Sequence, residues 1–254
     1  MSKTQHFKYS NSIIVYPLLM LFAIWMVFWY QVRIDSSIKG LGIRPQKIEG
    51  LLGIVTSPFL HGDINHIYNN SIPLLMLSIA LFYFYNKIAW KVIGLGILFS
   101  GFLTWLIASK GNHIGASGLI YVLVSFIFFK GIFAKHYRLI ALSLVVIFFY
   151  GSMIWYVFPI KTGMSWEGHL SGLITGFIFA LIFRRQVAKP ERYQWEEVDY
   201  DEDDDPFMRH FDEDGNFIEF DPEEAQAEAE VESEVNVPKK KAIKITYVFK
   251  KNED

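Results

Sequence analysis

Long, almost uncharged apolar blocks constrain this chain more than any other feature of its sequence. They cover residues 13–32, 66–85, 90–108, 114–133, 139–158 and 165–183. Each is close to the ~20 residues that cross the ~30 Å hydrocarbon core of a bilayer. The blocks are apolar all round, whereas helices of a soluble bundle carry an apolar stripe with a period of 3.6 residues. The sequence therefore predicts an all-α, polytopic membrane protein with six transmembrane helices.

The segments around the first block support this interpretation. A basic start followed by an apolar run could be a signal peptide, but this run is too long, and bulky Trp25 and Trp29 stand near its end. We expect an uncleaved span. Residues 33–65 then form a long first outer loop. Its apolar piece, residues 51–60, is too short to cross a bilayer and suits a membrane-associated element.

The chain changes character after the last block. The formal net charge of −2 averages a mildly basic membrane part and a strongly acidic stretch, residues 196–234. We expect a cytoplasmic N-terminus of residues 1–12, a six-span domain of residues 13–185, and an acidic, largely disordered cytoplasmic tail of residues 186–254. Within the tail, residues 242–249 alternate like a β-strand. The absence of cysteine excludes disulfides and thiol catalysis.

Lysine and arginine indicate the orientation, because cytoplasmic loops of membrane proteins are enriched in them. One set of connections carries Lys3, Lys8, Lys87, Lys91, Lys130, Lys135, Arg138, Arg184, Arg185 and Lys189. The opposite short loops carry Lys110 and Lys161, although the long first loop adds further basic residues. The simplest solution places both termini in the cytoplasm and starts spans two, four and six at the outer face.

Polar residues open these same three spans. Span two begins with His66 and Asn70, span four with Ser117, and span six with His169. Polar side chains in a span are costly and normally face the bundle interior or a water-filled cavity. Scattered polar residues would have no reason to share one side of the membrane, so the pattern favours one common site near the outer face.

Ser117 is the candidate nucleophile of that site. It lies in Gly115-Ala116-Ser117-Gly118, where free N–H groups at a helix start can meet an oxyanion. A serine needs a base within hydrogen-bond reach, and His169 is the candidate. The alternative is a small-residue packing motif, which would also suit Gly172 and Gly176 in span six.

His66 and Asn70 are one helical turn apart and can both donate hydrogen bonds to an oxyanion. Helix capping and interfacial polarity explain the neighbouring Asp63 and Asn65 well and these two less well. Tyr121 lies one turn after Ser117 and could support an imidazole ring by stacking, or simply fill the core.

A metal site is the weaker interpretation of the histidines. His61, Asp63, His66 and His169 could in principle bind zinc, but an HExxH pattern is absent. In the tail, residues 212–216 lack the ligand spacing of an EF-hand loop, which favours a solvated acidic linker.

The assembled pattern resembles the rhomboid family of intramembrane serine proteases. It comprises six spans, a long first outer loop, His66-x-x-x-Asn70, Gly115-Ala116-Ser117-Gly118, and His169-x-x-Gly172-x-x-x-Gly176 in that order. The resemblance covers residues 13–185 and not the tail. It implies an all-α, six-helix rhomboid-like bundle in a membrane, expected to be a bacterial inner membrane.

The resemblance also implies roles for the residues of the site. Ser117 matches the nucleophile and His169 the general base and acid of a serine–histidine dyad. His66 and Asn70 match the oxyanion-hole side chains, Tyr121 the aromatic ring beneath the histidine, and His61 a further histidine of the family. Single-span or polytopic membrane proteins would be the substrates. A cofactor, a metal and a nucleic-acid partner are not implied.

One departure and two alternatives accompany the resemblance. Many members carry a Trp-Arg pair in the first loop, and this chain has none between Arg33 and His66, which bears on the stability of that loop. A proteolytically silent relative that binds membrane clients is the main alternative, but such relatives lose the serine or histidine that this chain keeps. A small transporter is disfavoured because the sequence shows no related halves with interrupted helices.

Overall fold

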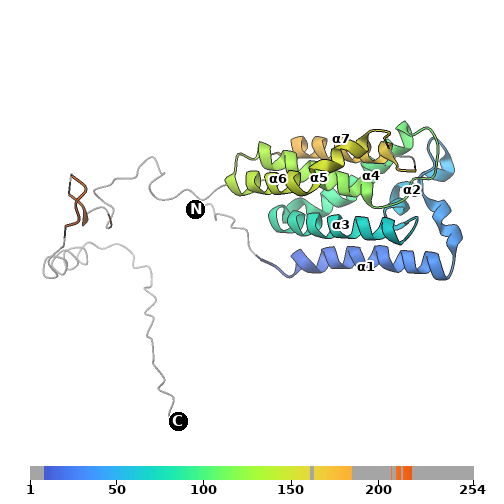
Figure 1. Ribbon diagram of the computed structural model, residues 1–254, viewed down its shortest axis with the longest axis horizontal. Coiled ribbons are helices and arrows are strands. Elements are labelled where there is room, and N and C mark those ends of the chain that lie inside the picture. The colour runs from blue at the N-terminus through green and yellow to red at the C-terminus, as the bar shows by residue number, and fades with distance from the viewer. Residues whose placement is uncertain (1–8, 161–162, 185–206, 208–209, 213, 219–254) are drawn as a thin grey trace, which may run out of the picture. The chain divides into compact units, whose positions relative to one another are not determined.

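The computed structural model describes residues 9–160, 163–184, 207, 210–212 and 214–218. The chain divides into two units, Met1–Pro190 and Glu191–Asp254. In the first unit the long helices lie roughly side by side, with α1 and α3 adjacent (Figure 1). The α-helices are α1 (Ser12–Arg33), α2 (Gly53–Thr56), α3 (Ile64–Phe84), α4 (Asn86–Ile107), α5 (Ser117–Phe133), α6 (Tyr137–Tyr150) and α7 (Trp166–Ile182).

Short 3₁₀ helices complete the described elements. They are η1 (Ser36–Leu41), η2 (Ile48–Gly50), η3 (Ser57–Phe59) and η4 (Gly151–Val157). The first three, with α2, form the loop between α1 and α3 and gather at one end of the helices, on the right of Figure 1. Because consecutive long helices run in alternating directions, the N-terminal ends of α3, α5 and α7 face this same end.

Four helical segments in the described part of the chain are long and apolar enough to cross a membrane: α1, α3, α4 and the joined segment Tyr137–Val157. Helices α5 and α7 are apolar but have only 17 residues each. At 1.5 Å per residue each is about 26 Å long, slightly less than the hydrocarbon thickness. The all-helical membrane class predicted from the sequence therefore agrees with the structure.

Two of the predicted spans differ from the observed helices. The block expected at 114–133 becomes helical only at Ser117, because residues 114–116 form the turn that leads into α5. The block expected at 139–158 is α-helical only to Tyr150 and continues as the 3₁₀ helix η4, which begins at Gly151. Glycine is a poor helix former, and the 3₁₀ winding that follows frees carbonyls which side chains of α5 and α7 use.

Helix α5 is the centre of the first unit. Residues 119–127 are all buried. The helix packs against α3, α4, α6 and α7. A helix covered on every side has no need of a polar stripe, which explains why this segment is apolar all round.

Helices α5 and α7 form the closest interface. A Cβ atom on Gly172 would overlap the carbonyl oxygen of Gly118, and one on Gly176 would overlap that of Val122. Ser125 Oγ donates a hydrogen bond to the carbonyl of Leu173 across the interface, at 2.7 Å. The glycines of α7 therefore let its backbone lie directly on α5, which sets the separation of Ser117 and His169.

The first loop is anchored on the end of α4 and on the turn before α5. Gln46 N donates to the carbonyl of Trp105 at 3.1 Å, and Trp105 Nε1 donates to the carbonyl of Lys47 at 2.9 Å. Ile43 and His113 pair through two backbone hydrogen bonds of 3.0 and 2.9 Å. These contacts hold the loop of a chain that lacks the Trp-Arg pair of many family members.

The described part of the second unit is a small turn. Phe211 and Phe217 form an antiparallel bridge, and the carboxylate of Asp212 accepts hydrogen bonds from the N–H groups of Asp214 and Asn216. The strand expected at residues 242–249 and most of the acidic tail lie outside the described residues.

Candidate active site

Ser117 is the first residue of α5, and a turn that requires glycine presents it. Gly115 has a φ of +114°, a left-handed conformation that disfavours any residue with a Cβ atom. Its N–H donates to the carbonyl of Ser57 at 2.9 Å, which fixes the turn against the start of η3. The chain thus enters α5 abruptly, and Ser117 Oγ lies in the first turn beside free helix N–H groups.

His169 of α7 meets Ser117 directly. Its Nε2 lies 3.1 Å from Ser117 Oγ, and its Nδ1 lies 2.9 Å from the carbonyl oxygen of Tyr156. A carbonyl can only accept, so in the neutral ring the hydrogen must be on Nδ1. Nε2 then carries the lone pair, which is the form able to take a proton from the hydroxyl of Ser117.

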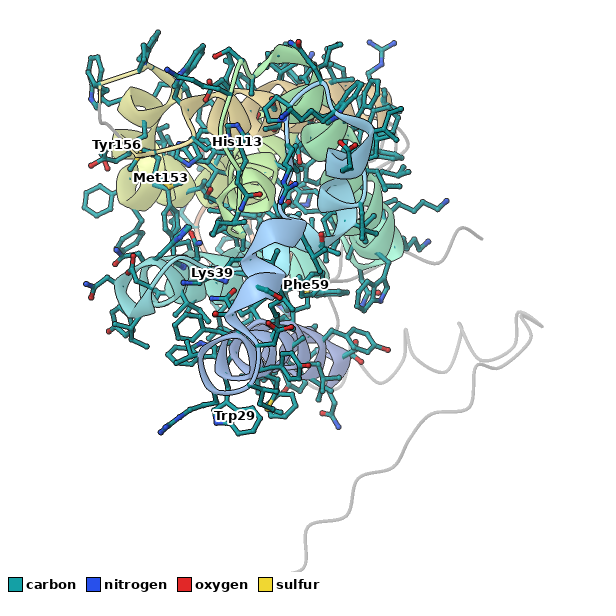
Figure 2. The ribbon with its side chains drawn as sticks, turned by 90° about the vertical axis from the view of Figure 1, so that its right-hand side faces the viewer. Trp29, Lys39, Phe59, His113, Met153 and Tyr156 are labelled. Carbon is teal, nitrogen blue, oxygen red and sulfur yellow. The ribbon has the colours of Figure 1, made fainter. Side chains whose placement is uncertain are left out.

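Tyr121 and η4 hold this imidazole in place. The rings of Tyr121 and His169 stack with centroids 4.4 Å apart and an interplanar angle of 14°. Tyr121 Oη donates to the carbonyl of Met153 at 2.7 Å. Two backbone carbonyls of η4, those of Met153 and Tyr156, therefore orient the histidine and the ring beneath it; both residues are labelled in Figure 2.

His66 and Asn70 lie together against the turn at Gly115. A Cβ atom on Gly115 would stand 2.5 Å from His66 Nε2 and 3.4 Å from Asn70 Nδ2. His66 Nδ1 accepts a hydrogen bond from Gly62 N at 3.3 Å, so in the neutral ring Nε2 carries the hydrogen. Asn70 Nδ2 is buried and has no hydrogen-bond partner within the described part of the chain. Two side-chain donors thus point at the turn that precedes Ser117.

Asp63 caps a helix, as the sequence predicts. Its carboxylate caps α3 by accepting from His66 N at 2.9 Å. Lys39 of η1 supports the same region, because its Nζ donates to the carbonyl of Gly62 at 2.8 Å and its own carbonyl accepts from Asn112 Nδ2 at 2.7 Å. In Figure 2 Lys39 lies at the end of the helices that carries the site.

His61 is fully buried behind His66, with ring centroids 5.1 Å apart. Burial lowers the pKa of His61 to about 4, so the ring is neutral near physiological pH. Its backbone is tied to α1, because Gln31 Nε2 donates to the carbonyl of His61 at 2.6 Å. His61 therefore contacts His66 through its ring and α1 through its backbone.

A cavity opens beside Ser117. Its walls come from the first loop, α4, the turn before α5, and the start of α7. The residues that line it are Ile43, Ile54, Ser57, Pro58, Ile97, Ser100, Gly101, Thr104, His113, Ile114, Gly115, Ser117, Gly118, Leu119, Ser165 and Gly168. A reacting group bound at Ser117 would therefore border a partly polar space. Within the described ranges, three or more His, Cys, Asp or Glu side chains do not converge on a possible metal position.

The structure thus brings together Ser117, His169, Tyr121, His66 and Asn70, as expected. The sequence does not indicate the backbone groups that contact these side chains, which are the carbonyls of Met153 and Tyr156 and the N–H of Gly62. Backbone groups carry no signal in a sequence, because every residue has them.

The chain is similar to known proteins over this region. The family model of the Rhomboid domain matches residues 49–186, which include all the residues brought together at the site. Uncharacterised proteins of Mycobacterium bovis and Mycobacterium tuberculosis are each 36% identical over 184 residues, covering 64% of this chain and 72% of the relative. One of Mycobacterium leprae is 35% identical over 172 residues, covering 61% of this chain and 64% of the relative.

Proposed function

Because the chain belongs to the rhomboid family, we propose that this integral membrane protein is a serine endopeptidase that cuts membrane-spanning substrates near the outer membrane face. The observation that carries the proposal is the hydrogen-bonded pair of Ser117 and His169, with the Nδ1 hydrogen of His169 committed to the carbonyl of Tyr156. A packing motif would bring the glycines together without requiring this tautomer or the stacked ring of Tyr121.

The first chemical step forms an acyl-enzyme. His169 Nε2 takes the proton from Ser117 Oγ while that oxygen attacks the carbonyl carbon of the scissile peptide. The negative charge that develops on the carbonyl oxygen meets the backbone N–H of Ser117 and the donors His66 Nε2–H and Asn70 Nδ2–H. The protonated His169 then gives its proton to the leaving amine, and the C–N bond breaks.

The second step repeats the chemistry with water. Water reaches the ester carbonyl from the outer side, His169 takes one of its protons, and the new tetrahedral intermediate collapses to release the carboxylic acid and restore Ser117. The cavity beside Ser117, lined partly by hydroxyl groups, supports this step by giving water a polar space next to the ester.

The membrane setting determines the kind of substrate. A transmembrane helix hides its carbonyls in hydrogen bonds, so a substrate must unwind locally before Ser117 can attack. Small or helix-breaking residues near the scissile bond lower that cost. We propose lateral entry near α6, six spans including the shorter α5 and α7, and cytoplasmic termini, which sets the N-terminal ends of α3, α5 and α7 at the outer face.

Cleavage of a model single-span substrate by the purified protein in detergent tests the proposal. The wild type should cut it, while Ser117→Ala and His169→Ala should lower kcat by about 10³-fold or more. Ser171→Ala is the matched control, because this buried hydroxyl donates to the carbonyl of Glu167 within its own helix. Equal cleavage by wild type and Ser117→Ala would refute the assignment. Binding of substrate without cleavage would favour the client-binding alternative.

A further inference from the structure

A second side-chain contact joins the turn before Ser117 to the helix of His169. His113 precedes Ser117 by one short turn, and Ser165 precedes α7. His113 Nδ1 lies 2.5 Å from Ser165 Oγ, and His113 Nε2 lies 3.2 Å from the carbonyl oxygen of Lys110. Both side chains are half-buried and line the cavity beside Ser117. Figure 2 shows His113 at the end of the helices that carries the site.

The hydrogen positions in this contact follow from its partners. The carbonyl of Lys110 can only accept, so in the neutral ring Nε2 of His113 carries the hydrogen and Nδ1 is an acceptor. Ser165 therefore donates its hydroxyl hydrogen to His113. The lone pairs of Ser165 Oγ remain available, and one accepts the N–H of Gly168 at 3.3 Å. The hydroxyl is thus used both as a donor and as an acceptor.

Ser165 controls the first turn of α7. Its side chain caps the helix through Gly168 N, and its backbone carbonyl accepts the N–H of His169 at 3.2 Å. A shift of Ser165 would therefore also move His169, one helical turn later.

His113 is equally well tied to the turn that presents Ser117. Its backbone forms a two-bond bridge to Ile43 of the first loop, and two residues later Gly115 is bonded to Ser57. The ring thus extends from a fixed backbone. The close packing of Gly172 on Gly118 joins α7 to α5 within the two helices. The His113–Ser165 bond joins the turn before α5 to the residue before α7.

We propose that His113 and Ser165 are positioning residues that hold His169 at hydrogen-bond distance from Ser117, and that this support depends on the protonation state of His113. The inference rests on the proposed proteolytic function. Protonation of His113 would place a hydrogen on Nδ1, which would then face the hydroxyl hydrogen of Ser165. Ser165 Oγ would then accept from both His113 Nδ1 and Gly168 N, its own hydroxyl hydrogen would lose its acceptor, and the geometry of the link at the start of α7 would change.

The surroundings of His113 favour the neutral ring. Burial lowers its pKa, while Glu167 of α7 and the Lys110 carbonyl oppose that change. The residues that line the cavity with it from the first loop and α4 are apolar or carry hydroxyl groups, without charge. Because the pKa is lowered on folding, the neutral bond is fully present above the ordinary value of 6.5 and is lost as pH falls through the folded value.

The test compares full-length variants in detergent between about pH 5.5 and 8.5. It measures kcat, KM, and the rate at which a fluorophosphonate probe labels Ser117, which depends on His169 but not on a protein substrate. His113→Ala and Ser165→Ala should each lower kcat and the labelling rate about tenfold at neutral pH, with KM unchanged. The double variant should be no worse than Ser165→Ala, because both single variants remove the same bond and Ser165→Ala also removes the helix cap.

Two further variants separate positioning from folding. S165D keeps a helix cap but cannot donate to neutral His113, so its activity should be low near pH 8 and rise relative to wild type as His113 becomes protonated and donates to the carboxylate. H113Q can accept and donate without titrating, so it should keep neutral activity and show a shallower acid decline. The loss of activity at acid pH that comes from protonation of His169 itself remains in every variant.

Thr175→Ala is the matched control, since this buried hydroxyl of α7 bonds only the carbonyl of Ser171 in its own helix. Wild-type kcat and labelling in His113→Ala and Ser165→Ala would overturn the inference. So would additive losses in the double variant, or an S165D pH profile parallel to that of Ser165→Ala. The proposed proteolysis fails separately, if wild type and Ser117→Ala behave alike.

Discussion

At the scale of single residues, Gly115 has little freedom to change. Its positive φ turns the chain into α5, its N–H is bonded to Ser57, and its missing side chain leaves room for His66 and Asn70. Gly115 therefore determines the position of Ser117 and also leaves space for both oxyanion donors. A larger residue here would disturb the site in two ways, through the backbone and through space.

The substitution Gly115→Ala tests this argument. The left-handed backbone costs about 1–2 kcal/mol for a residue with a Cβ atom, and the added methyl group would push His66 away from the turn. We expect the melting temperature in detergent to fall slightly and kcat to fall about 10²-fold. Steady-state cleavage assays with thermal unfolding of the same samples provide the measurement. An unchanged kcat would show that cleavage does not depend on the present position of His66.

The residues of the site differ in how far sequence could predict them. Ser117 and His169 could be chosen because a serine at a glycine-rich helix start and a histidine in a span are chemically distinctive. Tyr121 could be proposed only from its spacing. The η4 carbonyls could not be foreseen, since Gly151 weakens an α-helix but does not indicate that the chain continues as a 3₁₀ helix. In this chain, which lacks the Trp-Arg pair, Gln46 and Trp105 join the first loop to the end of α4.

At the scale of elements, the interface of α5 and α7 sets the catalytic distance. Gly172 and Gly176 place the two backbones in direct contact, and Ser125 fixes their register through the carbonyl of Leu173. The sequence suggested close packing by these glycines as an alternative to chemistry at Ser117. In the structure the two are compatible, because the packing of α7 on α5 is what carries His169 to Ser117.

A pair of glycine substitutions separates packing from helix propensity. In Gly172→Ala the new methyl group would overlap the carbonyl of Gly118 and the Cβ of Tyr121, so α7 must move. We expect a loss of about 1–3 kcal/mol in unfolding free energy and a large loss of kcat. Gly94→Ala in α4 is the control, since a Cβ there has nothing within 4 Å. Denaturant titration and cleavage assays should show lower stability and kcat for Gly172→Ala than for Gly94→Ala. Similar values for the two variants would show that close packing at Gly172 is not required.

At the scale of the whole molecule, every residue brought together at the site belongs to the first of the two units. One contact inside this unit indicates how far towards the C-terminus the chain must extend for the unit to be stable. Lys130 of α5 is fully buried and its ammonium group donates to the carbonyl of Phe183, just past the end of α7. A cation is stabilised at a helix C-terminus, where the carbonyl ends of the backbone dipoles gather.

Two truncations that differ by eight residues therefore should behave differently. Ending the chain after Pro190 keeps Phe183 and its carbonyl, so we expect cleavage of the model substrate and thermal stability close to those of the full chain. Ending it after Ile182 removes the partner of Lys130 and leaves a buried cation unsatisfied, which should sharply lower both the melting temperature and the yield of folded protein.

Adding Lys130→Met to the shorter chain should restore part of the stability. Equal stability of the two truncations would show that the carbonyl of Phe183 is not needed, and an inactive longer truncation would assign a role in cleavage to residues 191–254.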